Sequence, residues 1–301
     1  MKERDVRFYS EGIEISGIVR TPDGPGNGAG IVQGPGWLGL KDAKLYLPYH
    51  EAMTSAGFTV LIFDYRGFGG SGEGTLSPKT QLEDLINAVT YLQTLDGIER
   101  VGVFGSGGTG GGNAVLLAAN DPRVMCAVSQ VPVSDGADWL MRMRATEDEW
   151  DAFLKRLVAD RSNRVLTGHG EMVHPREEIM IPSAERRTTT VKKDVDGRIP
   201  NEVPLAAADE ILAYQPGEAA TKVAGLMIVA VENDLVTPTD HAEALFHAAV
   251  APKKLVMQHN TTHYAAYQQY GDEVIPMMVA WFERHIGGPQ GSEVERIEVG
   301  L

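Results

Sequence analysis

The segment from Val101 to Gly112, VGVFGSGGTGGG, constrains the fold more than any other part of this 301-residue chain. Its apolar first half is typical of a buried β-strand, and the residues NAVLLAAN, which favour a helix, follow the glycines at 113–120. Glycine adopts positive φ angles without steric cost, so a run of glycines permits a sharp turn between a strand and a helix. The segment therefore predicts a strand, a tight turn and a helix that belong to an α/β protein.

Strand and helix signals alternate along most of the chain. The continuous apolar run FTVLIF at 58–63 is typical of a strand buried on both faces of a parallel sheet. Strands are predicted near 6–12, 13–22, 28–34, 58–65, 98–105, 124–131, 224–231 and 254–258. Helices are predicted near 44–57, 81–95 and 113–120, with further helical patterns between the later strands. This alternation predicts a doubly wound, mainly parallel sheet of eight strands.

The alternation stops between Asp135 and about Leu205. The insertion opens on an amphipathic helix or helix pair, ADWLMRMRATEDEWDAFLKRLVADR, and continues as a polar, loop-rich stretch. Because long insertions of this kind are usually functional or disordered, we interpret it as a helical cap over the active site, inserted after the sixth strand. The expected divisions are a core at 1–136, the cap at 137–205, a second core part at 206–286 and a C-terminal tail at 287–301.

Composition limits the classes of partner. The formal net charge of −14 argues against nucleic acid and against an anionic membrane surface. Cys126 is the single cysteine, which rules out an intrachain disulfide, and its apolar surroundings predict a buried core residue. The first residues, MKERDVRFYSEG, lack an apolar signal-peptide region, so a cytoplasmic protein is expected. We expect a small-molecule substrate, no cofactor and no metal, with a homodimer as one candidate assembly.

Four blocks of the sequence resemble the α/β-hydrolase superfamily, in particular the branch of dienelactone hydrolases, acyl-peptidase-like esterases and S15 peptidases. They are GPGWLGLKD at 34–42, DYRGFGGSGE at 64–73, GSGGTGGG at 105–112, and the late pair VENDLVTP at 231–238 and NTTHYAAY at 260–267. In order and spacing they cover about residues 28 to 285. The resemblance implies the α/β-hydrolase fold, with a nucleophile on the strand-to-helix turn and an acid and a histidine later in the chain.

Two late residues match the acid and base positions of that superfamily. Asp234 follows a strand end in VENDLVTP, where the family places the acid that orients its histidine. His263 lies just past the last strand of the core, where the family presents its general base. Its neighbour His259 is expected to be structural, as are Asp64 and Arg66 of the arginine-glycine turn.

An oxyanion hole requires two backbone N–H donors aimed at one point. The resemblance implies that Gly108, directly after the nucleophile position, supplies one of them. The loop GPGWLG supplies the other, and because Pro35 has no N–H the donor there is Gly36 or Trp37. Trp37 is equally well placed to form a wall of the pocket.

The nucleophile position itself carries no reactive side chain. The frame Gly105-Ser106-Gly107-Gly108-Thr109 places Gly107 where the superfamily has a nucleophile. Thr109 and Ser106 are the alternative nucleophiles. Thr109 would lie two residues further into the helix, where a hydroxyl usually supports the helix start. Ser106 would place the bulky Phe104 at a position that must be small. We favour Gly107, with space for water or substrate beside the histidine.

Further candidates lie in the insertion and beside the histidine. Trp139, Met143 and Tyr264 are expected to line the substrate pocket, although the cap aromatics and methionines serve equally well to seat the cap on the sheet. His169, Glu171, His174 and Glu178 cluster in TGHGEMVHPREE, but glycine and proline interrupt the ligand spacing, so a polar loop is expected rather than a metal site.

The sequence therefore favours an enzyme that acts on a small or medium apolar carbonyl compound through His263 and Asp234. Hydrolysis of an ester, amide or C–C bond is the superfamily's default reaction. Three alternatives remain open. The first is a non-hydrolytic lyase, decarboxylase or isomerase that uses His263 as general base. The second is a ligand-binding protein without catalysis. The third is a hydrolase inactivated by an engineered Ser-to-Gly change.

Overall fold

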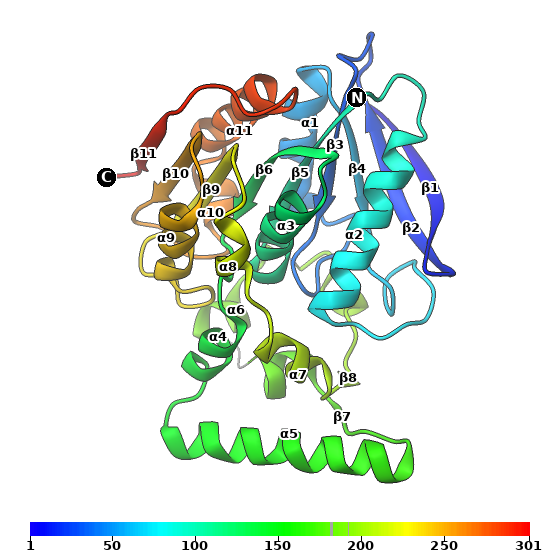
Figure 1. Cartoon of the computed structure of the whole chain (residues 1–301), viewed down its shortest axis with the longest axis vertical. Coiled ribbons are helices and arrows are strands. Elements are labelled where there is room, and N and C mark those ends of the chain that lie inside the picture. Colours follow the sequence, from blue (N-terminus) through cyan, green and yellow to red (C-terminus); the bar gives the residue numbers. More distant parts are fainter. Residues whose placement is uncertain (181–182, 192) are drawn as a thin grey trace.

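The computed structural model describes residues 1–180, 183–191 and 193–301. Its strands form one large sheet in the order β1-β2-β4-β3-β5-β6-β9-β10-β11 (Figure 1). β2 pairs antiparallel with β1 and with β4, and every other neighbouring pair is parallel. The predicted doubly wound, mainly parallel sheet is confirmed. The strands are β1 (Lys2–Ser10), β2 (Ile13–Thr21), β3 (Ala29–Gly34), β4 (Thr59–Phe63), β5 (Arg100–Ser106), β6 (Val124–Gln130), β9 (Leu226–Val231), β10 (Lys253–Gln258) and β11 (Val294–Val299).

The sheet has nine strands, whereas the sequence predicted eight. The additional strand is β11, which lies in the segment that the sequence predicted to be a surface tail at 287–301. Residues 294–299 read VERIEV, and Ile297 and Val299 lie on the less exposed face while Arg296 and Glu298 lie on the exposed face, as suits an edge strand. β11 pairs in parallel with β10 from Lys253 opposite Val294 to Gln258 opposite Val299. The C-terminus therefore extends the sheet by one strand.

Helices cover both faces of the sheet (Figure 1). One face packs against α2 (Pro78–Gln93), α3 (Gly108–Asn120), α8 (Pro216–Ala220) and α9 (Thr239–Ala248), and the other against α1 (Leu47–Ser55) and α11 (Gly271–His285). A short helix η1 (Lys44–Tyr46) precedes α1, and α10 (Ala266–Gln269) precedes α11. Every residue of β3, β4 and β9 is buried, as their continuous apolar sequences require. In the described part of the chain no helix combines the length and apolar character needed to cross a membrane.

Between β6 and α8 the chain leaves the layered core and folds beyond one end of the sheet (Figure 1). It contains α4 (Gly136–Arg142), α5 (Glu147–Thr167), α6 (Ala184–Thr188) and α7 (Ala207–Leu212). It also contains two short turns of helix, η2 (Pro175–Ile179) and η3 (Asp196–Arg198), and a two-stranded sheet of β7 (Met172–Val173) and β8 (Val203–Pro204). The long helix α5 lies on the outer side, whereas α4 lies next to the core (Figure 1). We refer to this segment as the cap.

The turn from β5 into α3 brings two stretches of backbone into direct contact. A Cβ atom on Gly105, near the end of β5, would overlap the carbonyl oxygen of Gly110 in the first turn of α3. Because backbone atoms cannot move aside as a flexible side chain can, only glycine fits at position 105. The strand and the helix are packed as closely at this turn as the backbone allows.

We expect Gly105→Ala to destabilise the folded protein by about 1–3 kcal/mol or more, because the added methyl group overpacks a backbone contact. The free energy of unfolding is measured by urea denaturation. Gly197→Ala is the matched control, since a Cβ at Gly197 meets nothing within 4 Å. A loss of stability in Gly105→Ala no greater than that of the control would contradict the close packing of β5 on α3.

Candidate active site

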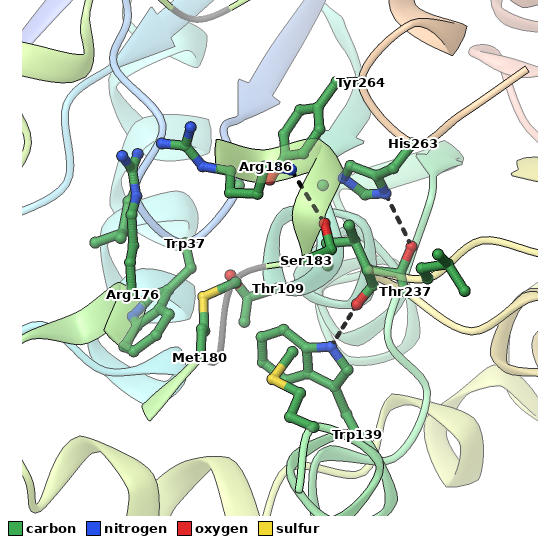
Figure 2. A pocket seen from close by; sticks show the side chains of 17 residues that line it. Trp37, Thr109, Trp139, Arg176, Met180, Ser183, Arg186, Thr237, His263 and Tyr264 are labelled. Carbon is green, nitrogen blue, oxygen red and sulfur yellow. Dashed lines mark hydrogen bonds between the residues drawn. The ribbon is translucent and has the colours of Figure 1, made fainter. Parts of the chain in front are cut away.

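The structure has a cavity of about 760 Å³, open to solvent, at the carboxyl ends of the parallel strands. It is lined by residues that follow β3, β5, β9 and β10 in the sequence, and by residues of the cap (Figure 2). Carboxyl ends of parallel strands meet at one edge of the sheet, and this edge is where open α/β sheets bind ligands. The cavity brings together Gly36, Trp37, Gly107, Gly108, Thr109, Trp139, Met143, His263 and Tyr264, all of which the sequence singled out.

His263 and Asp234 form a buried hydrogen-bonded pair beside this cavity. Nδ1 of His263 lies 2.8 Å from Oδ2 of Asp234. The Asp234 carboxylate also accepts the backbone N–H groups of Val236, at 2.7 Å, and of Thr237, at 3.0 Å. The residue before it, Asn233, has φ 56, a left-handed conformation that asparagine tolerates better than most residues. The turn after β9 therefore holds the carboxylate in a fixed direction.

These contacts set the protonation of the pair. Burial acts to raise the pKa of Asp234, but the His263 charge, its hydrogen bond and the N–H groups of Thr237 and Val236 outweigh burial and lower that pKa. An ionised carboxylate only accepts, so Nδ1 of His263 carries the proton in this hydrogen bond. In a neutral imidazole Nε2 is then free to accept a proton. Figure 2 shows one ring nitrogen of His263 directed toward Thr237 and the other into the cavity.

Gly107 occupies the turn between β5 and α3 in a conformation that favours glycine strongly. Its φ is 77 and its ψ is 169, a region that residues with side chains almost never occupy. A Cβ at this position would lie 3.1 Å from Cα of Gly36 and 3.7 Å from the hydroxyl of Tyr267. The N–H of Gly107 donates to the carbonyl oxygen of Gln130 at 3.0 Å, which fixes the turn to β6. The backbone of this turn therefore has a conformation that suits a residue without a side chain.

The two nearby hydroxyl groups are buried and bonded elsewhere. Ser106 Oγ donates to the hydroxyl of Tyr46 at 3.2 Å and accepts from the amide of Gln33 at 3.3 Å. Thr109 lines the cavity, but its Oγ1 donates to Oε1 of Gln81 at 3.1 Å. Both side chains are fully shielded from solvent. Neither hydroxyl is hydrogen-bonded to His263.

The cavity lining includes the candidate oxyanion-hole residues Gly36, Trp37 and Gly108. Gly108 is the first residue of α3, where N–H groups lack partners within the helix. The backbone N–H groups of Gly108 and Trp37 have no acceptor among the described residues. Burial raises the pKa of Tyr46 to about 12, while the hydroxyl of Ser106 and the backbone N–H of Gly36 act to lower it. The N–H of Gly36 therefore lies near Tyr46, which leaves Gly108 and Trp37 as the freer pair.

The cap supplies the rest of the cavity wall (Figure 2). Trp139 and Met143 line it from α4 and its end, and Trp139 Nε1 donates to the carbonyl oxygen of Val236 at 2.8 Å. Tyr264 lines the cavity beside His263, with the two ring centres 4.8 Å apart in an edge-to-face arrangement. Arg176 and Arg186 also line the cavity. The sequence analysis did not single out these two arginines.

Two more residues at the site escaped the sequence analysis. Thr237 Oγ1 donates to Oδ2 of Asp234 at 3.1 Å and lies 3.3 Å from Nδ1 of His263. Its position three residues after Asp234 is typical of an Asx-type turn, a signal that could have identified it. Tyr267 is buried, its ring centre is 6.3 Å from that of His263, and burial raises its pKa well above the usual value. Nothing in the sequence around Tyr267 indicated that its side chain lies near His263.

The remaining candidate residues serve the surrounding structure. Glu171 and Glu178 form ion pairs with Arg156, and among the described residues no group of three or more His, Cys, Asp or Glu side chains is arranged to hold a metal. His259 forms ion pairs with Glu232 and Glu298 at the sheet edge. In a separate cluster, Asp64 binds Lys41.

The chain is similar to several known proteins. The model of the prolyl oligopeptidase family matches residues 48–164. An uncharacterized 31.7 kDa protein of the traX-finO intergenic region of Escherichia coli is 32% identical over 287 residues, which cover 92% of this chain and 97% of the relative. The quorum-quenching protein AidA of Acinetobacter baumannii is 27% identical, with 87% of this chain and 88% of the relative covered. A thiohydrolase of Eupenicillium brefeldianum is 24% identical, with 88% and 87% covered.

Among solved structures, the α/β hydrolase GrgF of a Penicillium species superposes with a TM-score of 0.76 at 20% identity, covering 95% of this chain and all of GrgF. The chain belongs to the α/β-hydrolase superfamily. The resemblance read from the sequence blocks is confirmed, and the relatives identify this α/β hydrolase as an enzyme of the hydrolase class. The strand-to-helix turn where the resemblance placed a nucleophile carries Gly107 in this chain.

We expect the unmodified α/β hydrolase to resist serine-directed fluorophosphonates, because the hydroxyls of Ser106 and Thr109 are buried and hydrogen-bonded away from His263. Gly107→Ser should gain labelling at residue 107 and lose about 1–3 kcal/mol of stability, the usual range for a side chain in a strained backbone conformation. Peptide mass spectrometry locates the label. Labelling of Ser106 or Thr109 in the unmodified chain would contradict this interpretation.

Proposed function

We propose that this α/β hydrolase cleaves ester or thioester bonds by direct attack of water on the acyl carbon, without an acyl-enzyme intermediate. The observation that carries the proposal is the buried Asp234–His263 pair beside a cavity. Gly107, at the turn between β5 and α3, lines this cavity and has no side chain. A general base within reach of a water molecule is sufficient for such a reaction. The space that a serine or cysteine side chain occupies in related enzymes would hold that water.

In the proposed reaction His263 first accepts a proton from water and later donates it to the leaving group. Nε2 of His263 takes a proton from water as the water oxygen bonds to the acyl carbon, and Asp234 stabilises the resulting imidazolium. The negative charge that develops on the carbonyl oxygen is stabilised by the N–H groups of Gly108 and Trp37. When the tetrahedral intermediate collapses, the bond to the leaving group breaks and Nε2 returns its proton to the departing oxygen or sulfur. The products are a carboxylic acid and an alcohol or thiol.

A thioester suits this site better than an unactivated amide. Thiols have a pKa of about 8.5, so a thiolate leaves with little assistance, whereas an amide nitrogen must be protonated first. Direct water attack lacks the help that a covalent nucleophile gives, and a good leaving group offsets that lack. A relative over most of the chain carries the name thiohydrolase, which supports the same class. The apolar walls formed by Trp139, Met143 and Leu38 favour an acyl chain of small or medium size.

We expect His263→Ala to lower kcat by about 100- to 10,000-fold toward short-chain acyl thioesters, the usual contribution of a general base. The rate is followed by release of free thiol. His259→Ala is the matched control, because His259 lies close in sequence but is paired with Glu232 and Glu298. Unchanged turnover in His263→Ala would contradict the proposal.

Labelled water distinguishes the proposed reaction from its alternatives. Single-turnover hydrolysis in H₂¹⁸O should place one ¹⁸O atom in the carboxylic acid, and quenched samples should contain no acylated enzyme. An acylated residue would indicate a covalent nucleophile. Consumption of substrate without incorporation of ¹⁸O would indicate lyase or isomerase chemistry. Saturable binding without turnover would indicate a ligand-binding protein.

A further inference from the structure

The cap places two arginine side chains on one wall of the cavity. Arg176 belongs to η2 and Arg186 to α6, and both line the same cavity as His263. Their side chains are only 18% and 13% exposed. Figure 2 shows both guanidinium groups on the side of the cavity that lies across from His263. A single small molecule in this cavity would therefore contact the arginines and His263 at once.

The acidic groups nearby do not balance the two positive charges. Arg176 and Arg186 share one oxygen of Asp196, at 3.2 Å and 2.9 Å. The Glu185 carboxylate accepts the backbone N–H of Tyr264 at 3.0 Å, and within the described residues it forms no ion pair with either arginine. Glu177, which follows Arg176, lies 3.8 Å from Arg187 instead. Two guanidinium groups thus share a single carboxylate, which is itself one-third exposed.

The surroundings of Arg176 oppose its charge. Burial lowers the pKa of Arg176, and the positive charge of Arg186 lowers it further, while Asp196 acts in the opposite direction. A negatively charged ligand would offset both the burial and the repulsion between the two arginines, because its charge stabilises both guanidinium groups. Binding of an anion would therefore stabilise the two buried guanidinium groups in their charged form.

The orientation of Arg186 is fixed before any ligand arrives. Its guanidinium lies over the ring of Tyr264, 5.7 Å from the ring centre, and donates to Oδ1 of Asp196 at 2.9 Å. The planar guanidinium fork matches a carboxylate with two parallel hydrogen bonds. Since Tyr264 directly follows His263, the arginine wall is held in a constant relation to the catalytic histidine.

We propose that Arg176 and Arg186 form a carboxylate-binding subsite, and that the substrate is an acyl compound with a carboxylate at the end remote from the bond that is cleaved. This inference rests on the proposed hydrolase function, because it names the substrate class of the same cavity. The carboxylate would join Asp196 in neutralising the arginine pair, and the acyl chain would cross the apolar middle of the cavity toward His263.

The test compares N-acetylcysteamine thioesters of hexanoate and of adipate, which share chain length and differ in a terminal carboxylate. The unmodified protein should show a kcat/KM at least about tenfold higher for the adipate thioester, in line with charge-assisted hydrogen bonds. Arg186→Gln and Arg176→Gln should remove this preference by raising KM for the adipate thioester more than for the hexanoate thioester. Arg187→Gln is the matched control, because its exposed side chain lies outside the cavity lining.

A binding measurement separates this inference from the proposed function. Calorimetry on His263→Ala should show monomethyl adipate binding at least about tenfold more tightly than dimethyl adipate, with the difference lost when Arg186→Gln is added. Equal binding of the two ligands, or an equal loss for both thioesters in Arg186→Gln, would overturn the subsite. Failure of both thioesters to turn over, with selective binding of the carboxylate retained, would overturn the hydrolase function alone.

Discussion

The contact between the loop after β3 and the turn after β5 is the constraint on which the rest of the site depends. A Cβ on Gly36 would lie 3.1 Å from the carbonyl oxygen of Ser106, and a Cβ on Gly107 would lie 3.1 Å from Cα of Gly36. β3 and β5 are parallel neighbours, so their carboxyl ends meet at one edge of the sheet. With glycine on both sides, the two backbones approach closely, and Trp37 and Gly108, the residues that follow these glycines, line the same cavity. The cavity, the proposed oxyanion site and the space beside His263 all follow from that contact.

The buried His263–Asp234 pair is hard to explain by stability alone. Removing charged or polar groups from water is costly, and well-packed apolar residues of similar size are often as stabilising as a buried ion pair. Here the Asp234 carboxylate also accepts hydrogen bonds from the N–H groups of Val236 and Thr237 and from the Thr237 hydroxyl. These bonds fix the direction in which the carboxylate faces His263. A fixed, buried imidazole that faces a cavity is suited to proton transfer. This reasoning supports an enzyme over a ligand-binding protein.

The sequence predicted the parts of this protein that local patterns determine. Apolar strands, glycine turns and helical periods identified the sheet, and short motifs at strand ends identified Asp234 and His263, because strand ends meet in space by topology alone. The edge strand β11 was missed, since its six residues follow a glycine- and proline-rich stretch that is typical of a tail. Arg176, Arg186 and Asp196 were beyond reach for a different reason. They lie in the polar, loop-rich part of the insertion, and only the tertiary fold of the cap brings Arg176 and Arg186 to the cavity.

The cavity is therefore built from two parts of the protein, the core and the cap, which differ in how freely their residues can be substituted. Its chemistry comes from the strand ends of the core, where backbone contacts such as Gly36 against Gly107 leave almost no freedom. Its far wall comes from the cap, where side chains on η2 and α6 make the contacts. The two parts are tied together at Val236, whose N–H donates to Asp234 and whose carbonyl oxygen accepts from Trp139. Because α4 is anchored to the turn that holds the acid, the cap wall keeps its position relative to His263. Side chains in the cap can then change without disturbing the pair that we propose transfers the proton, which would make substrate choice and reaction chemistry separable in this fold.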